Sequence, residues 1–161
     1  MKDENNKKHI RNIYIDKSLN LLNICKIILL LSGLTYVIGF LIYNNFDFGL
    51  ILEIISFVFI FIAYYKILDN NLAAGKRCII ISMLPIIWLI IFDFIFLFLN
   101  LVAVFNDTSS IRQFLYQLEA YIFDISLFII TILLYKSHSS LNKADETKKS
   151  NNYLENFYDK L

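Results

Sequence analysis

An almost unbroken apolar run from Cys78 to Phe105 constrains this chain more than any other feature. A helix needs about 20 apolar residues, each rising ~1.5 Å, to cross a bilayer, and this run is longer than that. Asp93 lies inside the run, where a carboxylate costs roughly 2.5 to 3.5 kcal/mol on insertion scales. The sequence therefore predicts a membrane-spanning helix whose aspartate must be satisfied by another group.

The composition of the whole chain favours a membrane protein. Its 161 residues are 58% hydrophobic and only 18% charged, which is more apolar than a soluble domain needs to fill its core. The net charge of +1 suggests no nucleic-acid partner. Cys25 and Cys78 share no metal-ligand spacing, so no cofactor is expected. The abundance of Ile, Asn and Lys is expected of an AT-rich genome and suggests a low-GC bacterium.

Three further apolar segments accompany the first. The predicted fold is an all-α polytopic integral membrane protein, with four transmembrane helices in an N-in/C-in antiparallel bundle. The helices are expected at about residues 22–43, 48–65, 78–101 and 118–135, within a membrane domain spanning 22–135. No cleavable signal peptide is apparent before the first helix, so we expect that helix to be a retained anchor.

The two ends of the chain are polar. Residues 1–21 are basic, and the apolar spacing from Ile10 onward is typical of an amphipathic helix on the membrane surface. Residues 136–161 form a charged tail. The chain has 15 Lys and Arg residues. All of them lie in these two ends or in the loop 66–77, except Lys26, at the edge of the first helix, and Arg112. The positive-inside rule then places both termini and that loop in the cytoplasm, in a multi-pass plasma-membrane protein.

Small and polar residues follow one face of several predicted helices. Ser32 and Gly39 belong to such a stripe in the first helix, and Gly49 and Ser56 in the second. Stripes of this kind favour close helix packing in membranes. Pro85 is expected to kink the third helix and to free a backbone carbonyl, which neighbouring helices or a serine such as Ser82 can satisfy.

Three acidic residues on different helices are predicted to lie at one depth. With the orientation above, Glu53, Asp93 and Asp124 each fall roughly 7 to 11 Å below the outer boundary, at ~1.5 Å per residue. Glu119 lies nearer the outer surface, and Asn100 shares the face of Asp93 two turns away. The five residues form the candidate cation, proton or partner site.

Three interpretations of these acids stay open. In the first interpretation, they are protonated or hydrogen-bonded groups that only pack the helices. Alternatively, they line an outward-facing polar cavity that attracts protons, metal cations or a cationic molecule, since carboxylates held together favour the binding of positive charge. In the third interpretation, one acid pairs with a basic residue in the membrane helix of a partner protein.

No catalytic motif appears in the sequence. The two histidines, His9 and His138, lie in the predicted cytoplasmic ends, away from any nucleophile or acid in the helices. We therefore expect a small non-enzymatic membrane protein of accessory or immunity type, acting through the lipid bilayer and either a homo-oligomer or a membrane protein partner. The alternative is a small proton- or cation-coupled carrier or channel that uses the acidic cluster.

Overall fold

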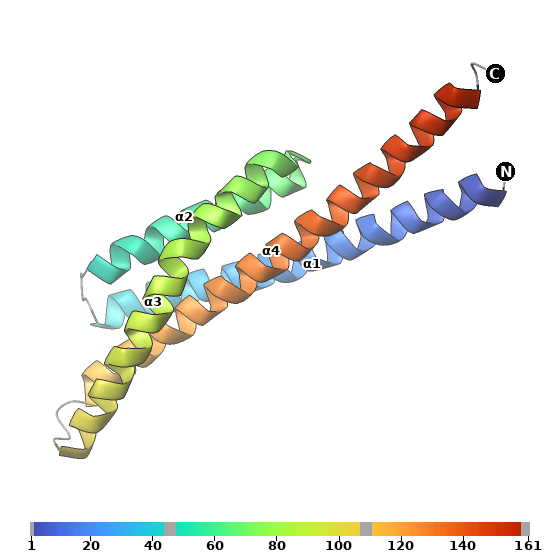
Figure 1. Cartoon of the computed structure of the whole chain (residues 1–161). Helices are drawn as coiled ribbons and strands as arrows, with labels where there is room; N and C mark the ends of the chain where they lie inside the picture. Colours follow the sequence, from blue (N-terminus) through green and yellow to red (C-terminus); the bar gives the residue numbers. More distant parts are fainter. Residues whose placement is uncertain (1, 44–47, 107–110, 159–161) are drawn as a thin grey trace.

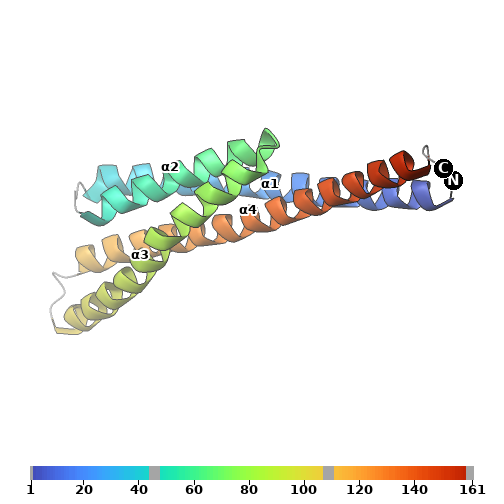
Figure 2. The ribbon, with the colours of Figure 1, turned by 45° about the horizontal axis from the view of Figure 1, so that its top comes forward.

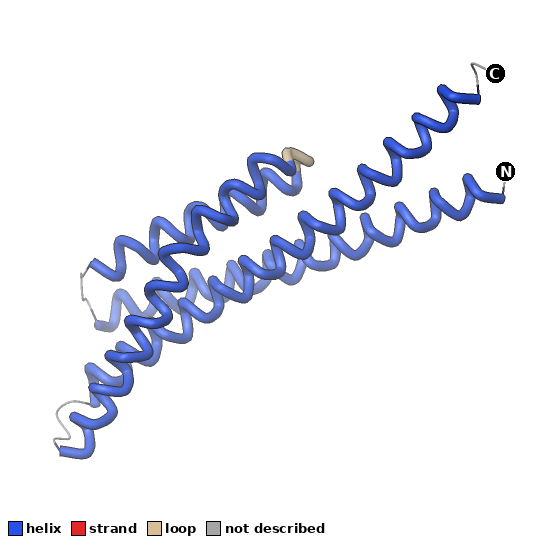
Figure 3. The backbone as a smooth tube through the Cα atoms, in the orientation of Figure 1, coloured by secondary structure: helices blue, strands red, loops and turns tan. Residues whose placement is uncertain are grey.

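Helices make up almost all of the described part of the chain. The computed structural model describes residues 2–43, 48–106 and 111–158. They form α1 (Lys2–Tyr43), α2 (Phe48–Leu68), α3 (Leu72–Asn106) and α4 (Ile111–Tyr158), with a short link between α2 and α3 and no strand in these ranges (Figure 3). Each helix contains a stretch long and apolar enough to cross a membrane. The all-α prediction with four apolar helices is confirmed.

The helices form two antiparallel pairs. α1 and α4 lie side by side over much of their length, and α2 and α3 fold back on each other (Figures 1 and 2). The second pair packs on the first mainly through contacts of α3 with α4, and α2 contacts α4 less. The two termini lie together at one end, where α1 and α4 extend beyond the other two helices (Figure 1).

Helix length differs widely among the four. α2 has 21 residues, so at ~1.5 Å per residue it is about 31 Å long and matches a hydrocarbon core of about 30 Å. α1 has 42 residues, α3 has 35 and α4 has 48, which makes all three longer than a bilayer crossing. Among the four helices, α2 therefore has the length closest to the thickness of the hydrocarbon core.

Buried residues in each helix recur at alternating steps of three and four. This period of 3.5 residues places side chains along one seam and is typical of left-handed coiled-coil packing. The seam residues are Ser18, Leu22, Cys25, Leu29 and Ser32 in α1; Glu53, Ser56, Ile60, Ala63 and Ile67 in α2; Ile79, Ser82, Ile86, Leu89 and Asp93 in α3; and Phe123, Leu127, Ile130, Leu134 and Ser137 in α4. The core is thus a set of narrow helix seams.

The side chains outside these seams are largely apolar and exposed. Leu41 and Leu84 are each 73% exposed, and many other Ile, Leu and Phe side chains on all four helices also face outward. Contiguous apolar surface of this extent is unusual on soluble monomers and marks a surface that contacts lipid or other proteins. The outward faces of the helices are therefore suited to a bilayer.

The N-terminal part of α1 packs along the C-terminal part of α4. The hydroxyl oxygens of Ser18 and Ser137 lie 2.6 Å apart, and both side chains are fully buried. The ammonium group of Lys143 lies 6.0 Å from the ring centroid of Tyr14, within cation–π range. The helix α1 is thus continuous from Lys2, and Tyr14 and Ser18 contact the C-terminal part of α4. The position of residues 1–21 on the membrane surface stays a prediction.

Pro85 lies inside α3, and the helix continues through it. Proline has no N–H, so the carbonyl four residues earlier, that of Ile81, loses its helical partner. The Ser82 hydroxyl donates to the carbonyl of Ile79 at 2.9 Å. Ser82 therefore satisfies a different carbonyl from the one that proline frees, although Figure 1 shows that α3 changes direction along its length.

Two asparagines form the link between α2 and α3. Asn70 has a φ of 58°, in the left-handed region that asparagine tolerates better than most residues. The N–H of Asn71 donates to the carbonyl of Lys66 at 2.8 Å and that of Asn70 to Ile67 at 3.0 Å, as in a Schellman motif. The Asn71 side chain then accepts from the N–H of Ala74 at 3.4 Å and caps the start of α3.

Replacing Asn71 with alanine removes this N-cap. We expect Asn71→Ala to lower the free energy of unfolding by about 1 kcal/mol, because the first turn of α3 loses one hydrogen-bond acceptor. Thermal unfolding of the detergent-solubilised protein, followed by circular dichroism, measures the loss. Asn71→Asp keeps an acceptor and is the control. Equal unfolding midpoints for the alanine and aspartate variants would contradict the cap.

Candidate functional site

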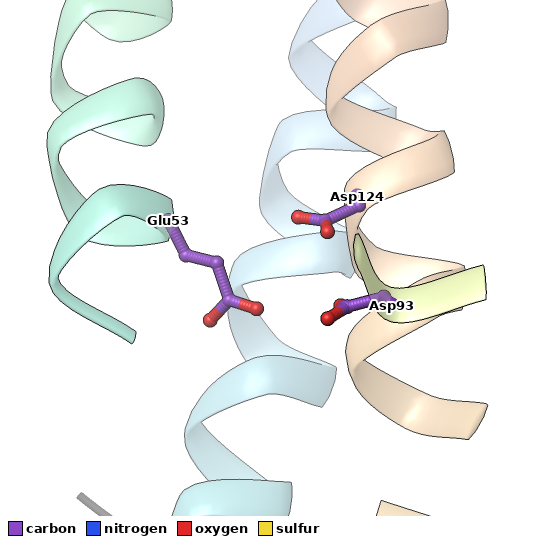
Figure 4. A group of neighbouring side chains, drawn as sticks. All are labelled: Glu53, Asp93 and Asp124. Carbon is purple, nitrogen blue, oxygen red and sulfur yellow. The ribbon is translucent and has the colours of Figure 1, made fainter. Parts of the chain in front are cut away.

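Three carboxylic acids from three different helices meet inside the bundle. Glu53 of α2, Asp93 of α3 and Asp124 of α4 point toward one another (Figure 4), and one oxygen of each lies within 4.8 Å of the others. Their side chains are 5%, 8% and 0% exposed, respectively. The structure therefore brings together the three acids that the sequence placed at one depth, and we call them the acid triad.

The helix seams explain why the three acids are buried. Glu53 and Asp93 occupy seam positions of α2 and α3, where apolar side chains stand at the other steps of the 3.5-residue repeat. Asp124 lies beside Phe123 of the α4 seam and seven residues before the buried Thr131. Packing of α2 and α3 onto α4 thus directs all three carboxyl groups inward.

No basic residue lies in the parts of the sequence that surround the acid triad. Residues 27–65, 78–111 and 113–135 contain no Lys, Arg or His. Arg112, next to these segments, donates from its guanidinium to the carbonyl of Ile42 in the last turn of α1, at 3.4 Å. That contact suits a helix C-terminus, whose carbonyls carry partial negative charge. The helices at the level of the triad therefore offer no cationic side chain of their own.

Glu53 and Asp124 differ in their hydrogen bonds. The Tyr36 hydroxyl of α1 donates to Oε2 of Glu53, while the Tyr36 ring stacks on Phe123 with a centroid distance of 4.2 Å. Neither carboxylate oxygen of Asp124 accepts a hydrogen bond from the described residues. A buried polar group of this kind costs roughly 1 to 3 kcal/mol unless something else satisfies it. A proton or cation bound at Asp124 would therefore offset the cost of burying this carboxyl group.

Tyr36 is a site residue that the sequence analysis did not identify. Its hydroxyl links α1 to the triad, so all four helices contribute a polar group. The spacing of Tyr36 with Ser32 and Gly39 was a signal for it, because a tyrosine in a stripe of small residues faces a neighbouring helix.

Glu119 lies beside the triad, on the side toward the start of α4. It lines a cavity of about 20 Å³ together with Glu53, Tyr36 and Gly39. Gly39 leaves the room for this, since a Cβ atom at that position would overlap the Glu119 carboxyl group. Asn100 is half-buried on α3, and its side-chain nitrogen donates no hydrogen bond to the described residues. Glu119 is not among the three acids whose oxygens lie within 4.8 Å of one another.

The predicted packing stripes contain real helix contacts. The Ser126 hydroxyl of α4 donates to the Ser32 hydroxyl of α1 at 2.8 Å. Ser56 is fully buried and donates to the carbonyl of Leu52 at 2.8 Å within α2. Gly39 faces Glu119, as described above, and Gly49 is half-buried at the start of α2. The stripe in α1 thus packs against α4.

The chemistry of the site follows from three close carboxyl groups in a poorly solvated interior. Carboxylates at this spacing repel one another when all are charged, so the arrangement favours the binding of positive charge, either protons or a metal ion. Carboxylate oxygens are ligands for hard cations such as Mg²⁺, Mn²⁺ and Ca²⁺, although these cations take six or more oxygens. Comparisons with protein-family models, curated proteins and solved structures found no match to this chain.

Removing the Tyr36 hydroxyl tests its link to Glu53. We expect Tyr36→Phe to lower the free energy of unfolding by about 1 to 3 kcal/mol, because a buried carboxyl group loses a donor while the ring stacking is kept. Unfolding in mixed detergent micelles measures the loss. Tyr121→Phe, which removes a tyrosine hydroxyl from α4 and keeps the ring contact with Phe94, is the matched control. Equal losses in the two variants would show that the Tyr36–Glu53 bond contributes nothing.

Proposed function

We propose that this chain is a multi-pass plasma-membrane protein with both termini in the cytoplasm, and that its acid triad binds positive charge inside the membrane. The protein then acts as a small proton- or cation-coupled carrier or channel. The membrane assignment is supported by the four apolar helices, their exposed apolar faces and the distribution of Lys and Arg.

One observation carries the binding proposal. Three buried carboxyl groups lie together while the surrounding helical segments contain no basic residue. A bilayer cannot supply the missing positive charge, since the hydrocarbon core excludes free ions and water. Protons or a bound cation are the remaining sources within one chain. Acids placed in this way are typical of proton and ion pathways in membrane proteins.

The sequence also predicts an accessory or immunity role without enzymatic activity. That role stays a prediction, because it depends on a homo-oligomeric or heterologous membrane partner rather than on any geometry within the chain. It differs from the carrier in one testable respect. In the accessory role the acids serve packing or partner binding, and the purified protein moves no ions.

Cysteine labelling tests the proposed topology. A membrane-impermeant thiol reagent added to intact cells should modify a cysteine placed at Asn45 or Asp107 and should not modify one placed at Ala74 until the cells are opened. The variants are made with Cys78 replaced by serine, because Cys78 is only half-buried, whereas Cys25 is fully buried. Labelling at Ala74 in intact cells would overturn the orientation.

Ion flux into proteoliposomes tests the proposed binding of positive charge. Vesicles contain the full chain and either a pH-sensitive or a metal-sensitive dye. A membrane potential, or a gradient of the tested ion, is imposed across the vesicle membrane. We expect flux of protons or of Mn²⁺ in the wild type and its loss in Asp93→Asn and Asp124→Asn. Glu146→Gln is the control, because Glu146 is exposed near the far end of α4.

The variants must remain folded for this comparison to count. Equal elution from gel filtration and equal helical content by circular dichroism establish that. Absence of both proton and metal flux in the wild type under each imposed gradient would contradict the carrier and leave the accessory role as the better explanation of the triad.

A further inference from the structure

We propose that protons are the charge that the triad takes up, and that Glu119 delivers them to Glu53 through a single water molecule. This inference rests on the proposed function and goes beyond it by naming the substrate, the access residue and the side of approach. Glu119 lies two turns into α4, toward the end of the bundle away from both termini, and Asp124 lies five residues deeper.

The size of the cavity between the two glutamates selects the substrate. Its volume is about 20 Å³, and a water molecule needs about 10 to 15 Å³ measured in this way. A water there has polar partners in Glu53, Glu119 and Tyr36, which line the cavity. A hydrated Mg²⁺ keeps several waters and Ca²⁺ takes 6 to 8 ligands, so neither cation fits. One water molecule and a migrating proton do fit.

Glu119 stands between this cavity and open space. It also lines a much larger groove of about 420 Å³ between α1 and α4, which includes Gly39 and Tyr36. Gly39 holds the Glu119 carboxyl group at the boundary, because only glycine leaves room for that group against α1. The groove extends to Ile42 in the last turn of α1 and to Leu115 near the start of α4, so it reaches Glu119 from that end of the two helices, while the small cavity connects Glu119 to the triad.

A second observation at the inner end of the path points to a ligand. Asp124 is fully buried and aimed into the triad (Figure 4), and neither of its carboxylate oxygens accepts a hydrogen bond from the described residues. A proton on this carboxyl group removes the buried charge and supplies a donor to a neighbouring acid. Asp124 is thus the group whose burial a delivered proton stabilises most.

The relay conserves protons and charge at every step. The Glu119 carboxylate takes a proton from a hydronium ion in the groove, which becomes water, and passes it to the water in the cavity, while that water gives one of its own protons to the Glu53 carboxylate. The cavity water is regenerated, Glu119 is again a carboxylate, and Glu53 has become neutral by gaining one proton from the groove. The proton is then shared within the triad, where one oxygen of each acid lies within 4.8 Å of the others. No further reactant is needed.

Two variants interrupt the relay at different atoms. Glu119→Gln removes the titratable group, and Gly39→Ala displaces its carboxyl group from the cavity. We expect each to slow proton uptake into proteoliposomes under a membrane potential, read with an internal pH-sensitive dye, by about a hundredfold, which is a typical contribution of a positioned proton-transfer group. Gly33→Ala is the matched control, because a Cβ atom there comes no closer than 3.4 Å to Phe57.

Infrared difference spectra separate the failure of the relay from the failure of the proposed function. A carboxyl band that responds to pH and is lost in Asp124→Asn reports proton binding by the triad. We expect Glu119→Gln to retain that band while its proton uptake slows. If Glu119→Gln and Gly39→Ala take up protons as fast as the wild type, the relay is wrong, whereas the binding of charge by the triad is unaffected. Flux of Mn²⁺ without protons would overturn the choice of proton, and neither band nor flux in the wild type would overturn both proposals.

Discussion

The placement of three carboxyl groups in helical segments that contain no basic residue is the constraint on which the rest of this structure depends. An apolar bundle with narrow seams gains most of its stability from close packing of small and branched side chains. Glu53, Asp93 and Asp124 replace such side chains at buried positions where α2 and α3 meet α4. Replacement with apolar residues of similar size would be expected to stabilise the bundle, so the acids are more easily explained by chemistry than by packing.

The site lies where the two helix pairs meet, so the charge on its acids affects the contact between the pairs. Glu53 and Asp93 come from the α2–α3 pair, whereas Asp124 and Tyr36 come from the α1–α4 pair. Repulsion among the acids therefore acts across the contact between the pairs, and neutralisation by a proton relieves it. α2 packs mainly on α3 and contacts α4 less, and the Tyr36–Glu53 hydrogen bond adds a link from α2 to α1.

Prediction from the sequence succeeded for features that depend only on the position of a residue along its own helix. Apolar runs fixed the number of helices, and depth along each helix predicted that Glu53, Asp93 and Asp124 meet. It failed where rotation of one helix against another decides the contact, as for Tyr36 with Glu53 and for Gly39 with Glu119. Periodicity shows that residues share a face, but the helix that covers the face depends on packing of the whole bundle. The pairing of the charged ends, marked by Ser18 and Ser137, was hidden for the same reason.

The length of α2 adds a limit on how the site works. If α2 spans the hydrocarbon core, Glu53 lies about 8 Å from the end at Phe48 and about 23 Å from the end at Leu68, at ~1.5 Å per residue. Uptake from the near side then needs only Glu119 and one water. Release on the far side requires a path along about three quarters of α2, past the seam of Ile60, Ala63 and Ile67, each at most 1% exposed. Binding is thus compatible with the observed packing, whereas transport requires the packing around these α2 residues to open, including the close approach of Ile67 to Gly75 of α3.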